Sequence, residues 1–133
     1  MSGRVTRRER GEWHFGWILE GRGVQDVWIV PRRSERAWRT DLYEYGTSVR
    51  FYDPKIDAWH STWHGPMHGV IRKFIARAVG DRIVLDGEDA RLRWTFRDIS
   101  ADRFLWTNEA LRDDGHTWEL QQDFVCRRAI TKQ

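Results

Sequence analysis

The sequence predicts an all-β protein, a single antiparallel up-and-down β-barrel of about 8–10 strands. Apolar and polar residues alternate over many short stretches, as between Trp13 and Leu19 and between Leu92 and Phe96. A period of two is typical of strands with one buried and one solvated face. Turn-forming sequences separate these stretches at short intervals, and nine tryptophans are available to fill or line an interior.

The predicted strands follow one another without a helical segment or a domain linker. The turn signals between them include Gly21-Arg22-Gly23, Asp53-Pro54, Gly80-Asp81 and Asp113-Asp114-Gly115. Closure of such a meander into a barrel removes exposed sheet edges, so we prefer a barrel to an open sheet. We expect strands at residues 10–20, 24–31, 42–53, 58–64, 69–79, 82–87, 90–98, 103–112 and 116–128.

The chain length of 133 residues is that of one domain, so we expect one barrel over residues 1–133. Residues 1–9 are expected to form an N-terminal arm, and residues 32–40 a polar loop that contains Trp38. The longest apolar runs are too short to span a bilayer, and the Arg-rich N-terminus lacks the apolar core of a secretory signal. A single cysteine, Cys126, rules out an intrachain disulfide and favours a cytoplasmic location.

The formal charge of +3 does not by itself indicate a nucleic-acid partner. The basic residues, mostly arginine, are scattered among 20 acidic ones, and no recognition motif is present. We therefore expect neither a nucleic-acid nor a membrane partner, and we leave a homodimer open.

The turn at Asp113-Asp114-Gly115 allows two strand faces to be matched. A three-residue loop places Asn108 opposite Leu120, Trp106 opposite Gln122 and Phe104 opposite Phe124. The large apolar side chains then share one face, whereas a slip of one residue would mix the faces. In this register Trp118 also points inward.

The same argument at Asp53-Pro54 places Phe51 opposite Trp59, Val49 opposite Ser61 and Thr47 opposite Trp63. Arg50, His60 and His64 then point outward. For the first hairpin two registers stay open. One hides Gln25, Val27 and Ile29. The other, which we favour because it hides Trp28, places Asp26, Trp28 and Val30 inside.

Aromatic walls with a few polar groups are typical of a small-molecule pocket in a barrel of this size. The alternative is a filled core, in which the polar groups only satisfy indole N–H donors. The predicted ligand-binding residues are Trp17, Trp28, Thr47, Phe51, Trp59, Ser61, Trp63, Trp94, Trp106, Asn108, Trp118 and Gln122.

No sequence motif for catalysis or metal binding stands out. His60, His64 and His68 recur every four residues, but a Gly-Pro pair prevents a helix, and on a strand this spacing is about 13 Å. We therefore expect no metal site, no haem and no other cofactor. Asp26 and His64 are the weak candidates for acid–base catalysis, Asp26 because burial beside indoles would raise its pKa. Cys126 has no neighbouring base in the sequence.

Six segments carry a resemblance to a known family: 11–17, 21–28, 45–54, 57–59, Trp94-Thr-Phe-Arg-Asp98 and Asp114-Gly-His-Thr-Trp118. Together they resemble a bacterial family of calycin-like, or lipocalin-like, proteins of uncharacterised function. The resemblance covers most of the chain and implies the barrel fold, but it implies no catalytic residues.

The function predicted from the sequence is binding of a small apolar or aromatic molecule in a tryptophan-lined interior. One alternative is a natural-product cyclase or isomerase that uses the same interior. Another is a non-enzymatic association domain with a filled core. The sequence does not decide whether a reaction is catalysed.

Overall fold

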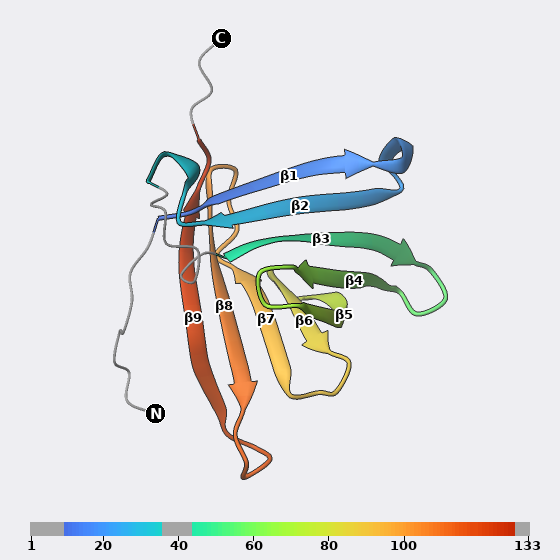
Figure 1. Cartoon of the computed structure of the whole chain (residues 1–133). Coiled ribbons are helices and arrows are strands. Elements are labelled where there is room, and N and C mark those ends of the chain that lie inside the picture. Colours follow the sequence, from blue (N-terminus) through green and yellow to red (C-terminus); the bar gives the residue numbers. More distant parts are fainter. Residues whose placement is uncertain (1–9, 36–43, 130–133) are drawn as a thin grey trace. The chain divides into compact units, whose positions relative to one another are not determined.

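The computed structural model describes residues 10–35 and 44–129, which form nine β-strands and two short 3-10 turns (Figure 1). The strands are hydrogen-bonded in sequence order in one sheet, and their registers are antiparallel. The turns are η1 Leu19–Gly21 and η2 Arg33–Glu35. The strands are β1 Glu12–Ile18, β2 Gly23–Val30, β3 Glu44–Asp53, β4 Ala58–Gly65, β5 Val70–Val79, β6 Arg82–Gly87, β7 Leu92–Arg97, β8 Arg103–Leu111 and β9 Trp118–Arg127.

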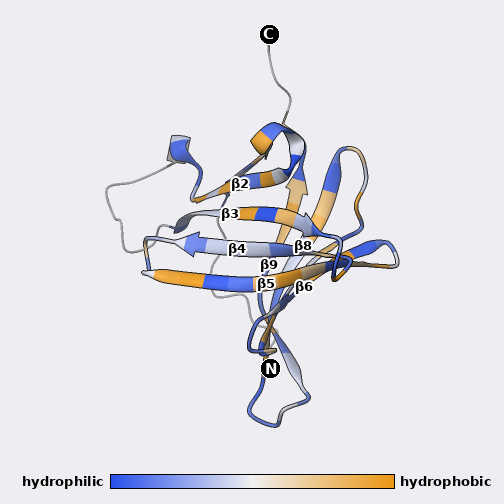
Figure 2. Ribbon diagram, turned by 90° about the vertical axis from the view of Figure 1, so that its right-hand side faces the viewer, coloured by the Kyte–Doolittle hydropathy of each residue, from blue (hydrophilic) through white to orange (hydrophobic). Residues whose placement is uncertain are grey.

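The predicted all-β class and up-and-down strand order are confirmed, and each predicted strand has its counterpart. Along β3 and β5, hydrophobic and hydrophilic segments follow one another (Figure 2). Within the described ranges, no helix has the length and hydropathy needed to cross a membrane. The predicted arm at residues 1–9 and Trp38 lie outside the described residues.

The described chain divides into two compact units at β5. The N-terminal unit runs to Phe74 and contains β1 to β4, and the C-terminal unit begins at Ile75 and contains β6 to β9. Closure of the sheet into a barrel, and with it a single enclosed interior, stays a prediction. Each unit is therefore described by itself.

In the N-terminal unit the first hairpin adopts the favoured register. Trp13 lies opposite Trp28, and Phe15 lies opposite Asp26. Asp26 in turn lies opposite Ser48 on β3. Because side chains alternate across a strand, one face of this unit carries all of these residues. We call it the tryptophan face, and it consists of Trp13, Phe15, Trp17, Val24, Asp26, Trp28, Gly46, Ser48, Arg50, Tyr52, Trp59, Ser61 and Trp63.

The predicted register of β3 and β4 is wrong by one residue. Asp53 lies opposite Ala58, so Ser48 faces Trp63 and Arg50 faces Ser61. The cause is the turn at residues 54–57, which is one residue longer than the hairpin we assumed and closes with Asp57 in the left-handed region, at φ 49°. An odd shift exchanges the two faces of one strand relative to its neighbour.

This correction moves three residues. Thr47 and Phe51 share the opposite face with His60 and His64, and Phe51 stacks obliquely on His60, with 4.9 Å between the ring centroids. Arg50, which we expected to point outward, lies on the tryptophan face. Trp59, Ser61 and Trp63 lie together on that face, as predicted.

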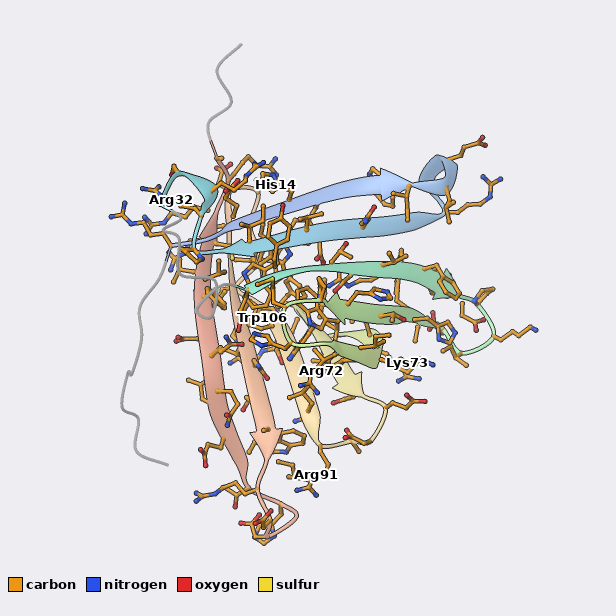
Figure 3. All side chains as sticks on the ribbon, viewed as in Figure 1. His14, Arg32, Arg72, Lys73, Arg91 and Trp106 are labelled. Atoms are coloured by element: carbon orange, nitrogen blue, oxygen red, sulfur yellow. The ribbon has the colours of Figure 1, made fainter. Side chains whose placement is uncertain are left out.

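The C-terminal unit has its own aromatic core. Trp106 on β8, labelled in Figure 3, is 1% exposed. Its ring meets that of Trp94 edge-on, with 5.5 Å between the centroids, and lies 5.5 Å from the ring of Phe124. Trp94 lies opposite Asn108, and Asn108 opposite Gln122, so these four predicted residues share one face: Trp94, Trp106, Asn108 and Gln122.

Trp118 is the exception, and its predicted inward position is wrong. The turn between β8 and β9 brings Leu111 opposite Trp118, and an irregularity between Asn108 and Glu109 then shifts the register by one. Such a β-bulge lets the two ends of one strand present different residues to the same face. Beyond the bulge Asn108 pairs with Gln122, whereas the predicted partner was Leu120. A shift of two residues leaves each side chain on its predicted face, because side chains alternate with a period of two. Near the turn the shift is one residue, so the side chains of β9 lie on the face opposite to the predicted one.

Candidate functional site

A buried ion pair lies in the middle of the tryptophan face. Nη1 of Arg50 donates a hydrogen bond to Oδ2 of Asp26 at 2.5 Å. The side chain of Asp26 is 1% exposed and that of Arg50 is 12% exposed. The two residues are diagonal neighbours on β2 and β3, since Asp26 lies opposite Ser48 and Arg50 opposite Val24.

Burial raises the pKa of Asp26, and the nearby Arg50 guanidinium opposes this by attracting and hydrogen-bonding the carboxylate. The indole N–H of Trp13 and the backbone N–H of Ser48 also favour the charged form. Among the described residues, Oδ1 has no hydrogen-bond partner in standard geometry. A buried carboxylate with an unused acceptor is a candidate for ligand recognition.

Aromatic rings cover one side of the ion pair. Trp13 stacks on Phe15 and on Trp28, at centroid distances of 5.3 and 5.4 Å, and Trp28 lies 5.6 Å from Trp63. The ring of Trp63 lies over Gly46, where a β-carbon would overlap it. Gly46 therefore makes room for the ring of Trp63, which adds apolar surface to the tryptophan face.

Toward the hairpin ends of β1 and β3, the same face carries exposed aromatic side chains. Trp17 on β1 is 72% exposed, and Phe15 and Tyr52 on the same face are also exposed. Tyr52 meets the ring of Trp59 edge-on at 5.8 Å, and its hydroxyl donates to Asp57 at 2.6 Å. Exposed aromatic side chains beside buried polar groups are the make-up of a small-molecule site.

Ser61 adds a second unused polar group to the face. It lies opposite Arg50, on β4, and is 2% exposed. Its hydroxyl has no hydrogen-bond partner within the described part of the chain. Thr47, in contrast, is fully engaged on the opposite face: its hydroxyl donates to the backbone oxygen of Asp26 at 2.6 Å and accepts from Gln25 at 3.1 Å.

The C-terminal unit offers a weaker candidate. Nδ2 of Asn108 donates to Oε1 of Gln122 at 3.1 Å, beside Trp94 and Trp106. This amide pair is uncharged, and it satisfies one donor and one acceptor internally. Trp118 lies on the other face, where the guanidinium carbon of Arg93 is 4.1 Å from its ring centre. Trp118 therefore does not join the residues with which we grouped it.

The remaining candidates lie apart from this face. His64 is exposed on the face opposite Trp63, and Nε2 of His60 donates a hydrogen bond to Oδ2 of Asp53 at 2.9 Å. The described residues contain no group of three or more histidine, cysteine or acidic side chains that could hold a metal ion. Burial raises the pKa of Cys126 to about 11, which keeps the thiol protonated at neutral pH and a poor nucleophile.

Sequence reasoning missed Arg50, although a signal for it exists. Asp53 begins the β3–β4 turn by accepting a hydrogen bond from the backbone N–H of Lys55 at 2.9 Å, and Asp57 ends the turn in the left-handed region. Aspartate suits both positions. A turn read from these two residues would have placed Arg50 and Asp26 on one face, where opposite charges attract.

Fold and site together define an all-β protein built as an antiparallel meander, with an aromatic face centred on a buried ion pair. No family model matches the chain, and comparison with curated proteins and with solved structures finds no significant match.

Proposed function

We propose that the tryptophan face of the N-terminal unit binds a small, flat, apolar or aromatic molecule. The ligand lies near the hairpin ends of β1 and β3, against Trp17, Tyr52 and Trp59, and reaches toward the ion pair of Asp26 and Arg50. A calycin-like relationship, which the sequence suggests, agrees with this proposal because small barrels of that kind hold one small ligand.

The observation that carries the proposal is the buried ion pair of Asp26 and Arg50 next to exposed rings. Burying two charges costs free energy that the pair's own attraction repays only in part, so such a pair is a poor device for stability alone. Large exposed aromatic residues are equally unfavourable on a surface with no partner. Ligand binding accounts for both features.

Equilibrium dialysis with naphthalene and with indole tests the proposal, with quenching of tryptophan emission as a second readout. We expect saturable binding to the wild-type protein at one site. Trp17→Ala should weaken it about five- to tenfold, because an aromatic contact is lost.

Phe51→Ala is the matched control. Phe51 is also exposed, at 49%, and lies in the same unit but on the opposite face. Its removal should leave the affinity within about twofold, since the ring contacts nothing on the tryptophan face. Absence of binding to both compounds, or equal weakening by Trp17→Ala and Phe51→Ala, would show that the tryptophan face is not a binding site.

A further inference from the structure

We infer that the ligand of the tryptophan face carries an uncharged hydroxyl group, as a phenol or an enol does, and that Asp26 and Ser61 recognise this group. The inference rests on the proposed function and specifies the chemistry of the bound molecule. It follows from the polar atoms on this face that are buried and have no hydrogen-bond partner among the described residues.

The first argument concerns charge. Asp26 and Arg50 neutralise each other at 2.5 Å in a setting that is almost closed to water. A ligand carboxylate or ammonium group would add a net charge to this neutral cluster and would lose its own hydration. An uncharged polar group avoids this cost, so the cluster selects against ions of either sign.

The second argument concerns hydrogen-bonding roles. Oδ1 of Asp26 is buried, has no hydrogen-bond partner among the described residues, and as part of a carboxylate only accepts. A donor group on the ligand would satisfy it. The hydroxyl of Ser61, buried and likewise without a partner, can donate or accept. A hydroxyl group supplies one proton for the carboxylate and lone pairs for a second contact, which a hydrocarbon or a ketone does not.

The third argument concerns position. Asp26 and Ser61 lie on β2 and β4, on either side of Arg50 on β3, and the exposed rings of Trp17 and Tyr52 lie on the same face. A flat ring that rests on these exposed side chains can direct a substituent into the polar row. The polar row thus determines which substituent is accepted, and the rings determine the shape of the molecule.

Three ligands of the same ring size test the inference by equilibrium dialysis at neutral pH: naphthalene, 2-naphthol and 2-naphthoate. We expect 2-naphthol to bind about tenfold more tightly than either of the others, because it makes a charge-assisted hydrogen bond that they do not. Ser61→Ala should reduce this preference about threefold or more.

The control is Thr62→Ala, one residue along β4 on the opposite face, which should keep the full preference. If Asp26→Asn folds, it should abolish the preference for 2-naphthol. If it does not fold, the result for Ser61→Ala decides the test. Equal binding of the three compounds, or tightest binding of 2-naphthoate, would overturn the inference but leave the proposed function standing. Failure of all three compounds to bind would overturn both.

Discussion

Arg50 on β3 donates a hydrogen bond from Nη1 to Oδ2 of Asp26 on β2, and the carboxylate side chain is almost fully buried. The pair joins two neighbouring strands through side chains of opposite charge on one face. Removal of either partner leaves the other charge buried without compensation, and this gives the pair a distinct mutational signature.

Asp26→Asn should lower the free energy of unfolding by about 3–5 kcal/mol, because Arg50 keeps its buried charge. The double variant Asp26→Leu/Arg50→Met should recover most of that loss, since it removes both charges and retains bulk. Urea unfolding curves of the wild type, Asp26→Leu, Arg50→Met and the double variant measure the coupling. Additive losses in the double variant would mean that the two side chains do not interact.

Gly46→Ala should destabilise the N-terminal unit by about 2–3 kcal/mol, because the new methyl group overlaps the ring of Trp63 and lies 2.7 Å from the carbonyl oxygen of His64. Gly16→Ala is the control, as no other atom lies within 4 Å of the β-carbon it would add. Its stability should stay within about 0.5 kcal/mol of the wild type. Thermal unfolding followed by tryptophan emission compares them, and similar losses in both variants would contradict the packing described.

Trp106→Ala and Trp118→Ala separate the two faces of the C-terminal unit. Trp106 is fully enclosed, so its truncation should cost about 3–5 kcal/mol. Trp118 is only partly buried and its ring stacks on Arg93, so its truncation should cost about 1 kcal/mol. Denaturant unfolding gives both values. Equal, large losses would restore the inward position of Trp118 that the sequence suggested.

Glu12 provides a pH test. Its carboxylate accepts hydrogen bonds from Nε, Nη2 and the backbone N–H of Arg33, at 2.7–3.2 Å, and these bonds are the main reason that its pKa falls from 4.5 to about 2. Because the pKa of Glu12 is lower in the folded than in the unfolded state, its ionised carboxylate stabilises the folded protein at pH values above 4.5. This stabilisation is lost as the pH falls from 4.5 toward 2.

Glu12→Gln should therefore be less stable than the wild type by about 1–2 kcal/mol at neutral pH, a value reduced by solvent screening at an exposed arginine. The difference should shrink as the pH is lowered through that window. Unfolding curves recorded over the pH range measure it. A difference that is independent of pH would mean that Arg33 does not hold the carboxylate in solution.

The sequence by itself determined the strands, their order and most of the turns, because these depend on local properties. The alternation from Trp13 to Trp17 and from Leu92 to Phe96 belongs to each segment alone, and turn residues such as Asp53 and Gly80 act within a few positions. Burial of Trp28 also chose correctly between the two registers of the first hairpin, since only one of them hides the indole.

Only the tertiary structure decided which side chains share a face where a turn or a bulge changes the count by one residue. One additional residue in the turn before Asp57 moved Thr47 and Phe51 away from the tryptophan face and brought Arg50 to Asp26. The bulge near Asn108 returned Gln122 to the predicted face but not Trp118. Hydrophobic alternation is satisfied almost equally by neighbouring registers, so the choice depends on contacts between strands distant in sequence, such as the ion pair of Asp26 and Arg50.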